Sequence, residues 1–234
     1  MQSVLFVIIA LVIAIILHEL AHGVVAYWLG DNTARRAGRL SLNPIKHIDR
    51  TGSIIVPLVL ALGQLLTIGR VAFMYGWAKP VPVNPMNLCL LGYRSPRRLM
   101  ALVAIAGPTM NFLLALVGGV AVHMAVALQS ASFLTFLAYF IQTNLLLGLF
   151  NLIPIPPMDG GRIAVGVLPL PVASRLAQAE RIGIAAVFLV LFIVPLVLRQ
   201  AGIYFDPFRD AITFVLPWAE HIVLLLTGND VGNN

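Results

Sequence analysis

Long apolar runs constrain this chain more than any other feature of its sequence. The residues from Val4 to Leu29, from Leu99 to Leu128 and from Phe133 to Ile153 carry almost no charge. An α-helix needs about 20 apolar residues to cross the hydrocarbon core of a bilayer. Only 10% of all residues are charged, whereas soluble domains carry roughly 25%. These runs therefore predict an all-α integral membrane protein.

Further apolar runs raise the predicted number of transmembrane helices to five or six. Residues 182–198 and 211–227 predict two C-terminal helices, and residues 52–69 contain Pro57 and Gly63. Proline and glycine both weaken a helix interior. The run 52–69 can therefore span the membrane fully, or enter and leave it on one side with a break near Pro57 or Gly63.

The distribution of Lys and Arg predicts the orientation of these helices. Cytoplasmic loops are richer in both residues than external loops. The loops 30–50 and 70–98 are basic, whereas the turn 129–132 has no Lys or Arg. We therefore expect an external N-terminus and a cytoplasmic C-terminus. Since both flanks of 52–69 are basic, a re-entrant segment is favoured there.

The net charge of +6 does not indicate nucleic-acid binding. The Lys and Arg residues lie in short loops beside apolar runs, where such side chains contact lipid headgroups. No basic helix face or aromatic stacking platform accompanies them. We expect a lipid bilayer as the surroundings and no nucleic-acid partner, while no feature of the sequence defines an oligomeric state.

A single polytopic domain is expected over residues 1–234. Its core is predicted at about 1–165, with two additional spans at about 182–227. The Pro- and Gly-rich stretch 76–85 predicts an irregular, β-like segment. No basic region precedes the first apolar run, as a secretory signal would require, so this run is expected to remain in the membrane. A prokaryotic plasma membrane is the expected location.

The first apolar run ends in His18-Glu19-Leu20-Ala21-His22. Residues four apart lie on one face of a helix, so both imidazoles can bind one metal ion while Glu19 acts as general base. A chance spacing on a polar helix interface is the alternative. Charged residues at the centre of a membrane helix cost roughly 2.5–3.5 kcal/mol on insertion scales. Because a bound cation offsets such a cost, the apolar surroundings favour a metal site.

Asp159 is the leading candidate for a third metal ligand, since a catalytic zinc usually has three protein ligands. Prolines precede it and glycines follow it, which predicts a helix end and a tight turn. An aspartate that merely caps a helix is the alternative. The predicted topology brings Asp159 to the same end of the bundle as His18 and His22, and this favours the ligand.

Four motifs follow one another between about residues 15 and 165. They are His18-Glu19-Leu20-Ala21-His22, Gly76-Trp77-Ala78-Lys79-Pro80-Val81-Pro82-Val83-Asn84-Pro85, Ala106-Gly107-Pro108-Thr109-Met110-Asn111, and Asn151-Leu152-Ile153-Pro154-Ile155-Pro156-Pro157-Met158-Asp159-Gly160-Gly161. In this order they resemble the site-2 protease family of intramembrane zinc metalloproteases, in a short prokaryotic form without the PDZ-like or nucleotide-sensing domain of larger relatives.

The resemblance implies residue roles. It implies Zn²⁺ held by His18, His22 and Asp159, with Glu19 catalytic. It also implies that Asn151 helps to bind the scissile segment or its oxyanion. Asn111 is a second catalytic candidate: a buried amide there can donate to a substrate carbonyl or simply bond another helix.

The predicted function is hydrolysis of peptide bonds within or near the transmembrane segments of membrane-protein substrates. A transporter that uses intramembrane His and Asp as an ion path is one rival, but such proteins often show repeated halves and no repeat is visible here. A relative that binds membrane proteins without cutting them is another. The intact Glu19 favours an active enzyme.

Overall fold

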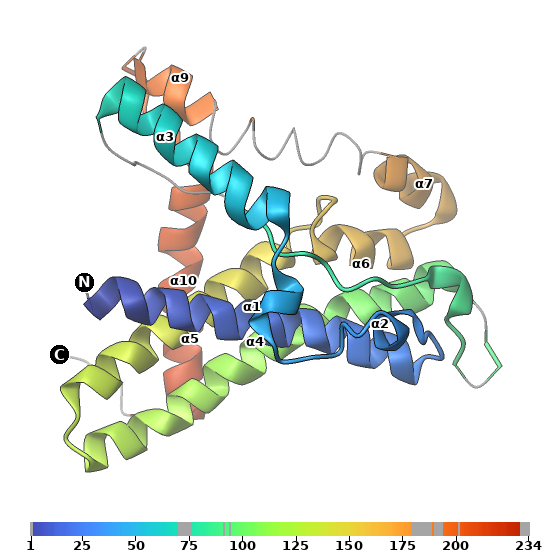
Figure 1. Ribbon diagram of the computed structural model, residues 1–234, viewed down its shortest axis with the longest axis horizontal. Helices are drawn as coiled ribbons and strands as arrows, with labels where there is room; N and C mark the ends of the chain where they lie inside the picture. The colour runs from blue at the N-terminus through green and yellow to red at the C-terminus, as the bar shows by residue number, and fades with distance from the viewer. Residues whose placement is uncertain are drawn as a thin grey trace.

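The computed structural model describes residues 2–69, 76–90, 92–93, 95–178, 189, 194–200 and 202–229. Every regular element within these ranges is a helix (Figure 1), and their one strand-like pairing is an isolated antiparallel bridge between Leu90 and Tyr93. The predicted all-α class is therefore confirmed for this part of the chain.

Three helices are long and apolar enough to cross a membrane among the described residues: α1 (Gln2–Trp28), α4 (Pro96–Ala127) and α5 (Ala131–Asn151). They match the three longest apolar runs of the sequence. Helices α1 and α5 run in one direction and α4 runs in the other (Figure 1). The start of α1 lies beside the start of α5, where Gln2 Nε2 donates to Ser132 Oγ at 3.1 Å.

A short turn makes α4 and α5 antiparallel neighbours. Helix α4 ends at Ala127, and the side chain of Ser130 accepts a hydrogen bond from the backbone of Phe133. A serine in this position satisfies one of the unpaired N–H groups at a helix start. The turn predicted at 129–132 therefore falls where α5 begins.

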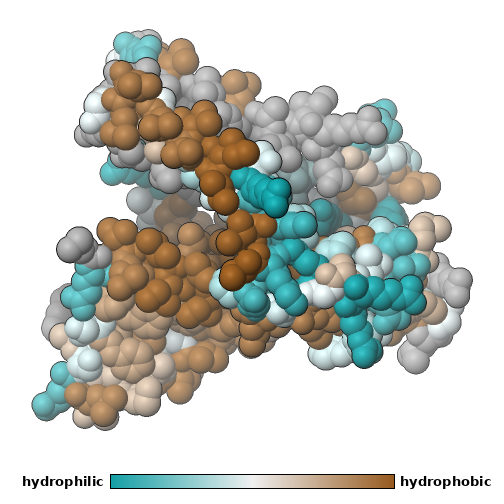
Figure 2. Space-filling view, viewed as in Figure 1, coloured by the Kyte–Doolittle hydropathy of each residue, from teal (hydrophilic) through white to brown (hydrophobic). Residues whose placement is uncertain are grey.

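Small residues line the faces along which these helices pack. Ala10 and Ala14 of α1, and Ala104 and Ala115 of α4, are fully or almost fully buried. Helices in membranes approach closely through such residues. Figure 2 shows hydrophobic side chains gathered over the N-terminal half of α1 and over α3 (Val56–Ile68). Hydrophilic side chains gather over α2 (Thr33–Arg36) and its adjoining loop. The exposed apolar surface suits contact with lipid.

The run predicted to be re-entrant forms the π-helical turn η2 (Arg50–Ile55) followed by α3 (Val56–Ile68). The helix continues through Gly63, so the break considered there is absent, whereas Pro57 lies where the helix type changes. The two flanks of this run lie together. Trp77 N donates to Gly52 O at 3.1 Å, and Lys79 N donates to the carbonyl of His47, in η1 (Pro44–His47), at 2.8 Å.

The remaining chain is also helical where it is described. It contains η3 (Pro85–Asn87), α6 (Asp159–Val167), α7 (Leu170–Gln178), α9 (Val194–Gln200) and α10 (Pro207–Leu226). The apolar run at 182–198 lies largely outside the described residues. The run at 211–227 falls in α10, whose first turns also carry Arg209 and Asp210. The total of five or six spans thus remains a prediction.

Candidate active site

Three buried side chains meet at one point between α1, α4 and α6. The Nε2 atoms of His18 and His22 lie 3.1 Å apart, and each lies 3.2 Å from Oδ2 of Asp159. The histidines lie one helical turn apart on α1, while Asp159 is the first residue of α6. The structure thus brings together three residues that the sequence predicted as metal ligands.

The surrounding hydrogen bonds define which ring nitrogens carry a proton. Nδ1 of His22 lies 2.7 Å from the carbonyl oxygen of Val103. A carbonyl only accepts, so this Nδ1 donates and the lone pair of the neutral ring lies on Nε2. Nδ1 of His18 lies 2.6 Å from Oδ1 of Asn111, and the same reasoning applies once the orientation of that amide is known.

A chain of buried amides fixes the orientation of Asn111. Its Nδ2 donates to Oδ1 of Asn144 at 3.1 Å, and Nδ2 of Asn144 donates to the carbonyl of Phe140 at 2.8 Å. Because the last acceptor is a carbonyl, every preceding amide is oriented. Oδ1 of Asn111 therefore faces His18 as an acceptor, and the Nε2 lone pair of His18 points to the same place as that of His22.

This arrangement fits a zinc ion. Two nitrogen lone pairs and a carboxylate oxygen converge, and buried Oδ2 of Asp159 receives no hydrogen bond from any described residue. Such a cluster is unfavourable without a cation between its members. Three ligands about 2.0–2.1 Å from one tetrahedral zinc lie roughly 3.3 Å apart, which matches the observed separations. The donor set of two histidines and one carboxylate is also one that catalytic zinc uses.

Glu19 lies beside this cluster and is held by the irregular segment that the sequence predicted at 76–85. The N–H of Val81 donates to Oε2 of Glu19 at 2.8 Å. Gly23 lets the segment approach α1, since a Cβ there would lie 2.9 Å from Cγ1 of Val81. The segment is extended, but no described part of it pairs as a β-strand.

The same segment is anchored on both sides of Val81. Buried Arg39 donates to the carbonyl of Lys79 at 2.5 Å, and Asn84 N donates to Oδ2 of Asp31 at 2.6 Å. Oδ1 of Asp31 also accepts from Asn87 Nδ2 at 3.0 Å. The position of Glu19 therefore depends on a segment that is fixed to the end of α1 and to the following loop.

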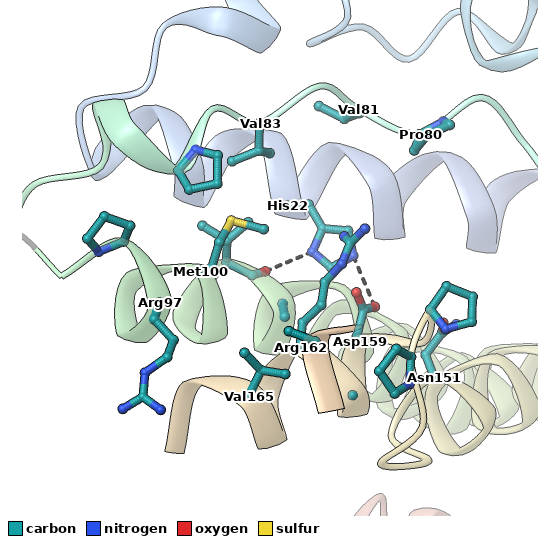
Figure 3. A pocket seen from close by; sticks show the side chains of 18 of the residues that line it. His22, Pro80, Val81, Val83, Arg97, Met100, Asn151, Asp159, Arg162 and Val165 are labelled. Carbon is teal, nitrogen blue, oxygen red and sulfur yellow. Dashed lines mark hydrogen bonds and ion pairs between the residues drawn. The ribbon is translucent and has the colours of Figure 1, made fainter. Parts of the chain in front are cut away.

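A cavity of about 610 Å³ opens onto these residues. Figure 3 shows Val83, Val81 and Pro80 along one wall, with His22 and Asp159 midway between Arg97 at one end and Asn151 at the other. Asn151 is the last residue of α5, and its Nδ2 donates to the carbonyl of Leu147 at 2.9 Å. The cavity thus opens onto all three candidate ligands and onto Glu19.

The other predicted candidates fall in different places. Asn111 is fully buried behind His18 and is bonded to protein groups, whereas Asn151 lines the cavity. His47 and His123 bond to the carbonyls of Ser41 and Thr227, at 2.8 Å and 2.7 Å. These two histidines lie outside the cluster.

Gly107 is a site residue to which the sequence analysis gave no role. A Cβ at this position of α4 would overlap Nε2 of His22 and would lie 2.5 Å from Cε1 of His18. Only a glycine lets α4 pass this close to both imidazoles. The motif Ala106-Gly107-Pro108 marked the position, but its spacing alone does not identify the opposing histidines.

The chain combines helices long and apolar enough to cross a membrane with a buried cluster of two histidines and one carboxylate and an adjacent glutamate. These features define the class as a membrane-associated metallopeptidase. The comparisons with known proteins agree. The family model "Peptidase family M50" matches residues 117–195. YwhC of Bacillus subtilis (strain 168), named as a candidate zinc metalloprotease, is 42% identical over 198 residues, which are 82% of this chain and 81% of that protein.

A more distant relative is Rip2 of Mycobacterium tuberculosis, which carries the same kind of name in two strains. It is 30% identical over 191 residues, which are 78% of this chain and 64% of that protein. No solved structure matches the chain. The chain belongs to peptidase family M50, the site-2 protease family, so the resemblance drawn from its motifs is confirmed. It is a metallopeptidase that uses zinc.

Proposed function

We propose that this protein hydrolyses peptide bonds within or next to the transmembrane segments of other membrane proteins. One observation carries the proposal: the zinc-fitting cluster and Glu19 line a cavity placed among helices long enough to cross a bilayer. A substrate that reaches this cavity from the membrane must itself be a membrane-embedded chain. The zinc ligands in this proposal are His18, His22 and Asp159.

The chain's own residues then perform defined tasks. Zinc, when bound, supplies a Lewis acid that polarises a peptide carbonyl and favours ionisation of water. Glu19 takes a proton from the attacking water and passes a proton to the departing amine. Val81 N–H keeps the Glu19 carboxylate in place during both transfers. Asn111 holds the His18 ring, which makes it a positioning residue.

Asn151 is assigned to the substrate. Its side chain lines the cavity at the end opposite Arg97, and one amide N–H is bonded to Leu147 O. The second N–H of the amide can donate to a peptide carbonyl in the cavity. Donors placed where charge develops stabilise the transition state. Asn151→Asp, which replaces this donor by an acceptor, should lower kcat while zinc stays bound.

The extended segment is proposed to align the substrate. The segment donates hydrogen bonds to residues between 19 and 52 through the N–H groups of Trp77, Lys79 and Val81. Alternate residues of an extended chain face opposite edges, so the backbone groups of Ala78 face away from residues 19–52. A substrate that unwinds can pair with this edge. Ala78→Pro should reduce cleavage without loss of zinc; full cleavage by this variant would exclude edge pairing.

The residues around 52–69 support a re-entrant segment in a chain of five or six spans. Gly52, at the start of the run, and His47, before it, accept hydrogen bonds from Trp77 and Lys79 after the run. A full crossing would separate the two ends of the run by about 30 Å. Cysteines introduced at Arg50 and Lys79, in a chain with Cys89 replaced by serine, should react with an impermeant reagent from the same side. Labelling from opposite sides would indicate a full span.

The location in this proposal is a prokaryotic plasma membrane, and the proposed substrates are transmembrane proteins. The decisive experiment compares wild type with Glu19→Gln in proteoliposomes that contain model transmembrane segments. We expect products that end within the apolar segment, and no products with the variant or a chelator. Bound zinc in both proteins without any cleavage, across a varied panel of segments, would contradict the proposal.

A further inference from the structure

Arg97 occupies one end of the active-site cavity and is held in place there. It is half-buried in the first turn of α4, and its Nη1 donates to the carbonyl of Leu168 at 2.6 Å. Leu168 is the residue at which α6 ends, so the guanidinium bridges α4 and α6. Figure 3 shows Arg97 at the end of the cavity away from Asn151, with His22 and Asp159 between them.

Four charged residues besides the histidines line the cavity among the residues that the structure describes. They are Glu19, Asp159, Arg97 and Arg162. Asp159 faces the two imidazoles, and Glu19 accepts from Val81. Within the described part of the chain, the ion pairs are those of Asp159 with the histidines, and none involves Arg97.

Among the residues that the structure describes, the guanidinium of Arg97 has one hydrogen-bond acceptor, the carbonyl of Leu168. An arginine has five N–H donors in a planar fork, and the Leu168 carbonyl uses one of them. The fork suits a carboxylate, which it can bind through two parallel hydrogen bonds.

The position of Arg97 along the helices also suits a charged substrate residue. Leu29, just after α1, and Leu99, in the first turns of α4, pack in one buried cluster, so α1 ends where α4 begins. Helix ends lie nearer water than helix centres, and a charge costs less there. A peptide that leaves the cavity past Arg97 therefore enters a region where an acidic side chain is tolerated.

We propose that Arg97 forms a subsite for a carboxylate side chain of the substrate. The enzyme then prefers chains that carry Asp or Glu a few residues from the scissile bond, on the side that leaves the cavity toward the start of α4. This inference rests on the proposed proteolytic function and specifies its substrate class. The apolar remainder of the cavity accepts the apolar residues around the cleaved bond.

The test uses the full-length, zinc-loaded protein in proteoliposomes. A model transmembrane segment with a mapped cleavage site is varied by placing one Asp at successive positions on either side of that site. Each Asp substrate is compared with its Asn counterpart, which has the same shape without the charge. We expect the ratio of kcat/KM for Asp over Asn to reach about tenfold at one position or two adjacent positions on one side, as a charge-assisted hydrogen bond provides.

Arg97→Gln should bring this ratio close to one, and Arg97→Glu should reverse the preference toward a Lys substrate. Arg98→Gln is the matched control, because it removes the same charge from the next residue of α4. Arg98 is exposed, donates to the Tyr93 hydroxyl and does not line the cavity. It should keep the wild-type ratio. Binding of the same peptides to Glu19→Gln should show the same preference without turnover.

The outcomes separate the two proposals. Cleavage of Asp and Asn substrates at equal rates at every position would overturn the subsite and leave the proteolytic function intact. A preference that survives in Arg97→Gln, or that disappears equally in Arg98→Gln, would also overturn it. Failure of wild type to cut any of these segments, with zinc bound, would instead contradict the proteolytic function and the subsite with it.

Discussion

The Oδ1 atom of Asn111 lies 2.6 Å from Nδ1 of His18, inside the protein and 93 residues away along the chain. This contact joins α4 to the metal cluster on α1. It holds the proton of His18 on Nδ1 and so turns the Nε2 lone pair toward His22 and Asp159. Such partners behind a metal ligand fix its tautomer and its orientation.

Replacing Asn111 with leucine should therefore weaken zinc binding. The side chains have similar size, but leucine offers no acceptor to His18, so the ring can rotate or change tautomer. We expect the zinc affinity to fall by about 10–100-fold. Competition with a chelator of known affinity, followed by metal analysis of the purified protein, measures this change.

Asn144→Leu provides a graded control for this prediction. Asn144 bonds to Asn111 and does not contact the histidines, so its loss should have a smaller effect on zinc affinity than the loss of Asn111. Thermal unfolding of the zinc-free variants shows whether either change acts through general stability. Equal zinc affinities for wild type and Asn111→Leu would contradict the positioning role.

Gly107→Ala should abolish zinc binding by a steric route. The added methyl group would overlap Nε2 of His22 and press on the ring of His18, so neither nitrogen could keep its place. Gly63→Ala is the matched control, since a Cβ at Gly63 on α3 would meet no described residue within 4 Å. Zinc content after purification should be near zero for the first variant and unchanged for the second. Full zinc occupancy in Gly107→Ala would show that α4 can move away from α1 here.

Asn111 and Gly107 illustrate how far the sequence alone could predict the site. His18, Glu19 and His22 follow from helical spacing within one apolar run, and Asp159 follows from the direction of the helices. The contacts of Asn111 and Gly107 depend on how closely α4 approaches α1, and no local pattern encodes that distance. Their motif marked both positions, but its partner residues appear only when the helices are packed.

The fold, like the site, could be predicted from the sequence only in part. Length and hydropathy placed α1, α4 and α5 to within a few residues, because a bilayer span has a fixed minimum length. The predicted irregular segment at 76–85 was located by its prolines and glycines. Its anchors could not be predicted, because Asp31, Arg39 and Glu19 reach it from distant parts of the chain.

Asp31 should give the protein a stability component that is lost in acid. Burial alone would raise the pKa of Asp31, but hydrogen bonds from Thr33, Asn87 and Asn84 outweigh burial and lower this pKa below its ordinary value. Because the folded-state pKa is lowered, the ionised Asp31 carboxylate stabilises the folded protein fully at pH values above the unfolded-state pKa of about 3.9. This stabilisation is lost as the pH falls through the folded-state pKa.

Asp31→Asn tests this contribution. The variant should be destabilised by about 1.5–3 kcal/mol at neutral pH, the range for hydrogen bonds to a charged group. Thermal unfolding in detergent between pH 3 and 7 should show a constant difference in Tm from wild type above about pH 5. The difference should shrink in more acidic solution, as wild type loses its charge. A difference that does not change with pH would contradict the assignment to the ionised carboxylate.

Val81→Pro should reduce catalysis while it leaves the metal cluster in place. Proline has no N–H, so Glu19 loses the hydrogen bond at 2.8 Å that holds its Oε2. The hydrogen bonds and ion pairs described for His18, His22 and Asp159 do not involve Val81. Misplacing a catalytic group by about 1 Å can cost about 100-fold in rate. We therefore expect kcat to fall by about 10–100-fold, with zinc content equal to that of wild type.

Val81→Ala keeps the N–H and removes only side-chain bulk, so its kcat should fall much less. Equal kcat values for the alanine and proline variants would show that Glu19 does not need this donor, and loss of zinc from Val81→Pro would assign the segment to the metal site instead.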